Sequence, residues 1–437
     1  MRKKVIIMGA AGRDFHNFNV LYRNDAATEV VAFTAAQIPF IEKRIFPPSL
    51  SGPLYPDGIP IYPEDELEQL IKKTGAQEII FSYSDVSYEY VMRLAALCAY
   101  LGADFVLPSF QKTMLKSTRP VISVCAVRTG CGKSGISRYI GRLLLEMGIK
   151  PVIIRHPMPY GDLAIQRLQR FSTLGDLDKH RCTIEEMEEY EPHIRAGLIV
   201  YAGVDYEAIL REAEKEGPVI IWDGGNNDLP FIEPDLEITV GDPLRAGHEL
   251  LYYPGEVNLR RADAVVINKA NGADRAAIET VVENIRKVNT KALIINTASV
   301  LKADREIKGK SVVVIEDGPT LTHGNMNFGA GIVAAREFGA IPVDPRPYAS
   351  GTIKKMFEKY PNLGPLLPAM GYSDGQKKEL EEAINSTPAE MALIATPVDL
   401  SRVLKLNKPI AAISYEIEEM ESPGLKGLIE SFIKGII

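Results

Sequence analysis

The feature that most constrains the 437-residue chain is an apolar run leading into a glycine-rich turn and then a helix-like segment. Residues 120–127 read Pro-Val-Ile-Ser-Val-Cys-Ala-Val, residues 129–134 read Thr-Gly-Cys-Gly-Lys-Ser, and residues 135–145 have helical apolar spacing. A strand, a glycine-rich turn ending in Lys-Ser and a helix are typical of the phosphate-binding loop (P-loop) of nucleotide enzymes. The full pattern has a glycine where this chain has Val127, so an ordinary βα turn is the alternative.

Each part of such a loop has a physical role. Backbone N–H groups at the helix N-terminus bind phosphates, a lysine adds positive charge, and a serine hydroxyl is a ligand for Mg²⁺. We therefore expect Lys133 to be catalytic and Ser134 to bind the metal. The residues predicted to bind the nucleotide here are Arg128, Thr129, Gly130, Cys131, Gly132, Lys133, Ser134 and Gly135.

A carboxylate follows another buried-type strand. Residues 219–222 read Val-Ile-Ile-Trp and lead into Asp223 and two glycines. In nucleotide enzymes a carboxylate at the end of a strand beside the P-loop helps to hold Mg²⁺. We expect Asp223 to be a metal ligand and a catalytic residue, with a surface βα turn as the alternative.

A third loop bears on the choice of nucleotide. Asn268-Lys269-Ala270-Asn271 follows the apolar run 264–267. GTPases carry Asn-Lys-x-Asp at such a position, and the aspartate accepts two N–H bonds from guanine. An asparagine amide donates as well as accepts. We therefore expect Asn268, Lys269 and Asn271 to bind ATP, with GTP as the alternative.

The polar loop 155–162, Arg-His-Pro-Met-Pro-Tyr-Gly-Asp, follows the apolar run 150–154. Its position after the second strand of this unit predicts that it faces the γ-phosphate or the acceptor. Arg155 and His156 are candidates to bind an anionic substrate, and Asp162 to orient a nucleophile or a metal. We predict catalytic roles for all three residues, and substrate binding for Arg155 as well.

A second glycine-containing turn follows the apolar run 5–8. Gly9-Ala-Ala-Gly12 lacks the G-x-G-x-x-G spacing of a dinucleotide site, which argues against NAD. A phosphate or carboxylate of the substrate suits the start of the following helix. The predicted substrate-binding residues are Gly9, Gly12, Arg13 and His16, and a tight turn with solvated side chains is the alternative.

Strand-like and helix-like segments alternate along the chain, which predicts an α/β fold with mostly parallel sheets. We divide it into a Rossmann-like α/β domain (1–116), a P-loop NTPase domain (117–300) and a C-terminal α/β region (301–437).

Composition excludes several classes of function. The net charge of −7 argues against nucleic-acid binding. No run reaches the roughly 18 apolar residues of a membrane span, and the N-terminal apolar run is too short for a signal peptide. Four scattered cysteines suit a reduced, cytoplasmic protein. A homodimer is the assembly that we expect.

Five segments carry a family resemblance: 8–19, 128–134, 155–162, 222–228 and 253–259. Together they resemble a prokaryotic family of predicted P-loop GTPases related to cyclic 2,3-diphosphoglycerate synthetase, along the whole chain. The resemblance implies ATP-driven closure of 2,3-diphosphoglycerate to a cyclic pyrophosphate.

Our functional hypothesis from the sequence is an ATP-dependent, Mg²⁺-dependent phosphoryl-transfer ligase, or synthetase, acting on a small phosphorylated metabolite. The alternative is a P-loop GTPase or ATPase that acts as a switch or maturation chaperone for a protein partner. A synthetase turns over ATP only with its small acceptor, whereas a switch hydrolyses slowly and responds to a protein.

Overall fold

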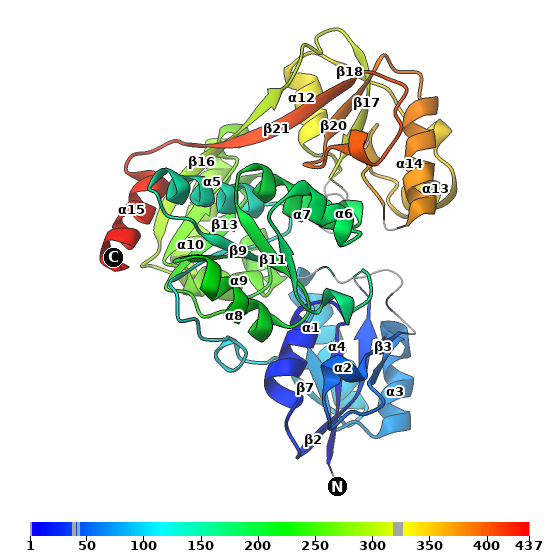
Figure 1. Cartoon of the computed structure of the whole chain (residues 1–437), viewed down its shortest axis with the longest axis vertical. Coiled ribbons are helices and arrows are strands. Elements are labelled where there is room, and N and C mark those ends of the chain that lie inside the picture. The colour runs from blue at the N-terminus through cyan, green and yellow to red at the C-terminus, as the bar shows by residue number, and fades with distance from the viewer. Residues whose placement is uncertain are drawn as a thin grey trace.

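The computed structural model describes residues 2–36, 41, 44–156, 158, 160–317, 327–371 and 373–436. Three α/β units follow one another along the long axis (Figure 1). We call them the N-terminal unit (residues 2–116), the central unit (117–300) and the C-terminal unit (301–436). Their sheets are mostly parallel, so the predicted α/β fold class is confirmed.

The N-terminal unit is built around a six-stranded sheet in the order β3-β4-β2-β1-β5-β7. Its elements are β1 (Lys3–Met8), α1 (Arg13–Asn17), β2 (Thr28–Ala35), β3 (Ile45–Phe46), α2 (Pro48–Ser51), β4 (Ile59–Pro63), α3 (Leu67–Thr74), β5 (Glu78–Phe81), β6 (Val86–Ser87), α4 (Tyr88–Tyr100) and β7 (Asp104–Val106).

This sheet is doubly wound. From β1 the chain adds β2 and β4 on one side and then β5 and β7 on the other, all in parallel. In such sheets a ligand binds beyond the carboxyl ends of the strands, where the strand order reverses. Here that point lies between β1 and β5, so the loops after Met8 and Phe81 flank it.

The central unit begins a second, larger sheet, in which β8 lies between β12 and β13. Its elements are β8 (Val121–Ala126), α5 (Lys133–Glu146), β9 (Val152–Arg155), β10 (Gln169–Phe171), α6 (Leu174–Lys179), α7 (Ile184–Arg195), β11 (Ile199–Ala202), α8 (Tyr206–Glu216), β12 (Ile220–Asp223), β13 (Leu236–Gly241), β14 (Tyr252–Tyr253), α9 (Gly255–Arg261), β15 (Ala264–Ile267), α10 (Arg275–Val288) and β16 (Leu293–Ala303).

Every residue of β8 is buried, as the uninterrupted apolar run predicts for a parallel strand covered on both faces. The adjacent β12 ends at Asp223, which is paired with Val124 of β8. The carboxyl ends of these two strands therefore bring the P-loop and the Asp223 loop to the same edge of the sheet.

The C-terminal unit extends the same sheet through β16, which pairs with β15 over residues 293–296 and with β21 over residues 297–303. Its further elements are β17 (Ser311–Glu316), α12 (Ala330–Glu337), β18 (Ile341–Pro342), α13 (Gly351–Lys359), β19 (Leu367–Pro368), α14 (Asp374–Ser386), β20 (Met391–Ala395), β21 (Ile410–Glu419) and α15 (Gly424–Ile436).

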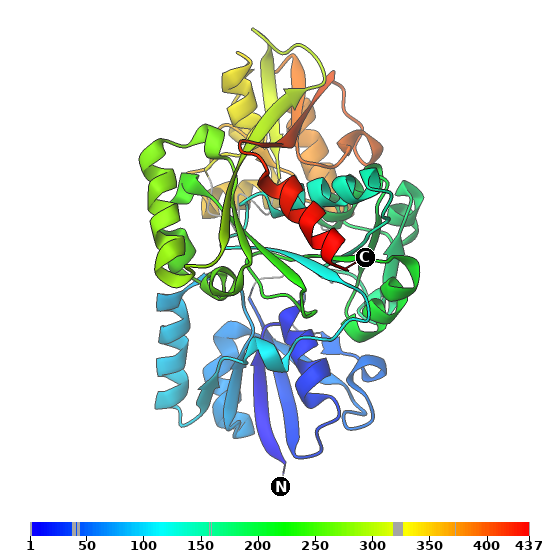
Figure 2. The same ribbon diagram turned by 90° about the vertical axis from the view of Figure 1, so that its left-hand side faces the viewer.

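The division expected between residues 300 and 301 falls inside β16, so one strand serves two units. The C-terminal helix α15 packs back on the central unit, as Figure 2 shows. Leu425, Ile429 and Ile433 of α15 are buried in the same core as Ile136 and Ile140 of α5. Their spacing of four residues forms one apolar stripe on the helix.

Within the described ranges, no helix combines the length and the apolarity needed to cross a bilayer.

Candidate functional site

A cavity of about 570 Å³ lies where the three units meet. The N-terminal unit contributes the loops after β1 and β5, which flank the reversal point of its doubly wound sheet. The predicted site residues that line the cavity are Gly12, Arg13, Thr129, Gly130, Gly132, Lys133, Ser134, Arg155, His156, Asn268, Lys269 and Asn271. Those that do not are Gly9, His16, Arg128, Cys131, Gly135, Asp162 and Asp223.

The glycine-rich turn opens onto this cavity at the start of α5. The helix has 14 residues, and its first residue is Lys133. Gly132 precedes it with a left-handed φ of +95°, and no side chain caps the helix. Gly135 donates to the carbonyl of Gly132 at 3.1 Å, and no side chain caps the N–H groups of Lys133 and Ser134 before it.

Three side chains donate hydrogen bonds to the backbone carbonyls of this turn. Arg245 donates to the carbonyl of Thr129 at 2.8 Å, Lys269 to that of Gly130 at 2.5 Å, and Asn268 to that of Cys131 at 2.9 Å. In a trans peptide the N–H points opposite to the C=O. The following N–H groups, of residues 130–132, are thereby turned away from these donors, an arrangement that suits an anion.

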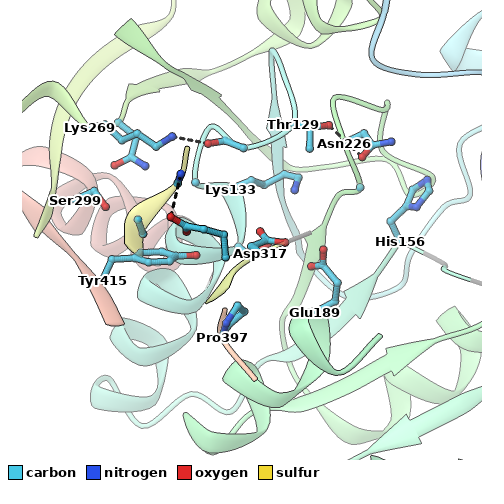
Figure 3. A pocket seen from close by; sticks show the side chains of 18 of the residues that line it. Thr129, Lys133, His156, Glu189, Asn226, Lys269, Ser299, Asp317, Pro397 and Tyr415 are labelled. Atoms are coloured by element: carbon cyan, nitrogen blue, oxygen red, sulfur yellow. Dashed lines mark hydrogen bonds between the residues drawn. The ribbon is translucent and has the colours of Figure 1, made fainter. Parts of the chain in front are cut away.

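Lys133 is the cation that remains available in this cavity. Its ammonium group makes no hydrogen bond or ion pair with another described residue, and Figure 3 shows its side chain between Asp317 and the Thr129 loop. Burial and the nearby Arg155 lower its pKa from the ordinary value. A bound phosphate would restore the charge balance around it.

The two predicted metal ligands differ in how far they are exposed to the cavity. Ser134 lines the cavity, whereas Asp223 is fully buried behind it. The Asp223 carboxylate accepts from Ser137 Oγ and His193 Nε2, each at 2.9 Å. Although burial raises its pKa, Arg155 and His193 hold it well below the usual range.

The partner that sequence reasoning missed is His193, on α7. An isolated histidine carries no signal in the sequence, because its contact with Asp223 depends on how α7 packs. Among the described residues, no group of three or more His, Cys, Asp or Glu side chains is arranged to hold a metal. Mg²⁺ bound with a nucleotide takes few ligands from protein and most from phosphates and water.

Asn271 lines the cavity, and its amide bonds the backbone of Ser299. Nδ2 donates to the carbonyl of Ser299 at 3.3 Å, and Oδ1 accepts from the N–H of Ser299 at 3.0 Å. Asn268 and Lys269 are likewise engaged with the P-loop backbone. These three side chains therefore stabilise the P-loop and the loop after β15, and their expected contact with the nucleotide stays a prediction.

Of the three catalytic residues predicted at the end of β9 and in the following loop, two line the cavity and one does not. Arg155 forms a salt bridge with Glu189 of α7, and its guanidinium also lies 3.7 Å from Asp223. His156 enters the cavity with Nε2 3.0 Å from Asp228. Asp162 is exposed and accepts the N–H groups of residues 164 and 165, so it caps a turn outside the cavity.

At the N-terminal end, Arg13 pairs with Asp228 at 3.0 Å and stacks on the ring of Phe231. His16 stacks parallel to Phe231, with ring centroids 4.2 Å apart, and its Nε2 lies against the carbonyl of Thr113. Burial lowers the pKa of His16 to about 3. His16 therefore forms part of the packing between two units, outside the cavity.

Arg128 has a similar structural position. It is 1% exposed, pairs with Asp85 of the N-terminal unit at 2.6 Å, and lies 3.5 Å above the ring of Tyr252. This buried pair joins the start of the P-loop to the loop after β5.

Sequence reasoning missed the acidic residues of the cavity wall. Glu189 comes from α7, and Glu316 and Asp317 come from the end of β17 in the C-terminal unit. Glu316 accepts the N–H groups of Gly329, Gly331 and Ile332 at the start of α12, and burial raises its pKa to about 7. A carboxylate after a buried strand, the signal that singled out Asp223, also exists at Glu316.

No family model matches the chain. It is 58% identical over 436 residues to the arginine synthetase ArcE of Thermococcus kodakarensis, covering 99% of this chain and 97% of the relative. It is 24% identical over 295 residues to a cyclic 2,3-diphosphoglycerate synthetase of Thermococcus sibiricus, covering 60% of this chain and 66% of the relative. LpxK from Aquifex aeolicus, solved in complex with ATP, is 15% identical, covers 84% of this chain and 99% of that chain, and has a TM-score of 0.48.

The resemblance to cyclic 2,3-diphosphoglycerate synthetases that the sequence suggested is a distant relationship over part of the chain, and not over its whole length. The relationship to ArcE covers nearly every residue. The chain belongs to the family of the arginine synthetase ArcE, and it is a nucleotide-dependent enzyme of the synthetase kind.

Proposed function

We propose that this protein is an ATP-dependent synthetase that forms arginine, with citrulline, the amino acid that carries oxygen in place of one guanidinium nitrogen, as the acceptor of the γ-phosphoryl group. The relative that matches the chain almost end to end is called an arginine synthetase. The P-loop and the crevice of the N-terminal unit open into one cavity, which supports phosphoryl transfer between ligands held by the two units.

The charge of the cavity is the observation that favours citrulline as the acceptor. Its lining cations other than Lys133 are all paired: Arg13 with Asp228, Arg155 with Glu189, and Lys269 with Asp242. A bisphosphorylated acid beside a triphosphate would need several unpaired cations, because like charges repel strongly at low dielectric. A zwitterionic acceptor adds no net charge and needs fewer, which favours it over the phosphorylated metabolite.

The chemistry balances as two displacements. The ureido oxygen of citrulline attacks the γ-phosphorus, the bond to the β-phosphate oxygen breaks, and ADP leaves. A nitrogen nucleophile, ammonia in the simplest case, then adds to the activated carbon, and phosphate leaves with the oxygen. The nitrogen gives up a proton to a base, and the products are arginine, ADP and phosphate.

The residues of the cavity suit these steps. The N–H groups of the P-loop and Lys133 would hold the transferred phosphoryl group in line. Neutral His156, oriented by Asp228, would accept the proton of the attacking nitrogen. Mg²⁺ would neutralise phosphate charge, and Ser134 is the P-loop residue that would hold it. Asp223 would act indirectly, by fixing Arg155 and the first turns of α5.

The test is a product assay with purified protein, ATP, MgCl₂ and ammonium chloride. With citrulline we expect arginine and ADP in equal amounts, and with 2,3-diphosphoglycerate no acceptor-dependent ADP. Lys133→Met should remove turnover, whereas Lys354→Met, an exposed lysine of α13, should not. Turnover with 2,3-diphosphoglycerate and none with citrulline would overturn the proposal. Hydrolysis insensitive to either compound would favour the switch.

A further inference from the structure

We propose that the purine base of the nucleotide binds against α12 of the C-terminal unit, on an apolar wall that includes Phe328 and Val333. This deepens the proposed function and rests on nucleotide binding at the P-loop, but it does not depend on which acceptor is used.

In the loop that corresponds to the base-reading loop of GTPases, each of the three predicted side chains already has a partner. Asn268 and Lys269 hold P-loop carbonyls, and both ends of the Asn271 amide bond the backbone of Ser299. These side chains are polar, so an apolar surface for the faces of a base has to come from other residues.

Several large apolar side chains that line the cavity are exposed. Leu244 is 47% exposed, Val333 38% and Phe328 37%, and all three line the cavity together with Leu301. Large apolar side chains left open within a concave site are typical of ligand pockets. A planar aromatic base would cover them, and Phe328 would add stacking.

The position of this wall agrees with the direction of a nucleotide. In Figure 3, Lys133 lies between His156 at one end of the site and Lys269 and Ser299 at the other. The γ-phosphate must point toward the acceptor, at the His156 end. The base therefore extends toward Ser299, and Leu301 follows two residues further along β16.

One polar group completes the wall. Glu337 lies one helical turn beyond Val333 on α12, is exposed, and lines the cavity. Its carboxylate is a hydrogen-bond acceptor, which matches the exocyclic amino group of a purine. The C-terminal unit, whose role the sequence left open, is thereby part of the proposed nucleotide site.

The experiment compares a ligand that has a base with one that lacks it. We would measure Kd for ADP and for pyrophosphate by calorimetry, with Mg²⁺ and no acceptor, in Phe328→Ala and Val333→Ser. Ile341→Ser is the matched control, because Ile341 is 60% exposed in the same unit and lies outside the cavity lining.

We expect the Kd for ADP to rise at least about fivefold in each wall variant, the lower end of the range for losing a base–aromatic contact. The Kd for pyrophosphate should stay unchanged, which also reports that the P-loop is folded. An unchanged ADP affinity in both variants, or an equal loss for ADP and pyrophosphate, would overturn the proposal. Both results are independent of arginine formation, so this inference and the proposed reaction can fail separately.

Discussion

His156 shows how single residues set the chemistry of this cavity. Burial lowers the pKa of His156 below the ordinary value. Asp228 raises this pKa in part, and the positive charges of Arg155 and Arg13 lower it further. The imidazole is therefore neutral at neutral pH, with Nε2 beside the Asp228 carboxylate. A neutral histidine with one nitrogen oriented by a carboxylate is equipped to accept a proton.

We predict that His156→Gln lowers kcat by about 100-fold, a typical effect of losing a general base. The Kd for ADP should change little, because the P-loop contacts remain. In the unsubstituted protein, activity should fall with acid only below about pH 6.5, because the pKa of His156 is depressed from that value. Measurements of kcat from pH 5 to 8 test both expectations, and His180→Gln, at the C-terminal end of α6, is the control. An equal loss in the control would contradict the role.

At the scale of elements, the P-loop works because the turn and α5 fit against the loop after β15. A Cβ at position 132 would lie 2.1 Å from Nδ2 of Asn268, and the φ of +95° already disfavours any side chain. The glycine is thus required by the same asparagine that holds the carbonyl of Cys131.

We predict that Gly132→Ala raises the Kd for ADP at least about tenfold, because Asn268 must move and release the loop. Gly148→Ala is the matched control. Gly148, just beyond the end of α5, also has a positive φ, of +78°, but a Cβ there would meet no atom within 4 Å. Both variants should lose about 1 kcal/mol of stability, and only the first should lose affinity. Equal affinities in titration calorimetry would show that the contact with Asn268 is unimportant.

The sequence was informative about elements whose determinants are local. The apolar run before Gly130 and the spacing after Ser134 predict β8 and α5, and an aspartate after a buried strand predicts the position of Asp223 at the end of β12. Its burial was not predictable, because the Asp223 partner His193 comes from α7. The roles assigned to these residues stay predictions.

At the scale of the whole molecule, three units contribute to one cavity, and long-range packing decides which residues reach it. Asp317 and Val333 enter it from the C-terminal unit, although nothing near them in the sequence resembles a nucleotide motif. Between the N-terminal and central units, His16 is buried against Phe231 as a neutral ring. That interface is therefore sensitive to acid.

We predict that stability falls between about pH 6.5 and 3 partly through His16. Its folded pKa, about 3, lies below the unfolded value, so the unfolded chain binds the proton first and acid favours unfolding. For His16 alone this amounts to about 2 kcal/mol between pH 7.5 and 5. Thermal unfolding of His16→Phe at both pH values should show a smaller loss of Tm than the unsubstituted protein shows. Identical losses would contradict the assignment.

The most direct test of the account is to follow the ureido oxygen during turnover. Citrulline labelled with ¹⁸O at that atom would be incubated with the protein, ATP, Mg²⁺ and ammonium, and the phosphate and nucleotide products analysed by mass spectrometry. Transfer of the γ-phosphoryl group to the acceptor predicts one ¹⁸O in each inorganic phosphate released, with unlabelled ADP. Label in AMP, or arginine formed with unlabelled phosphate, would contradict it.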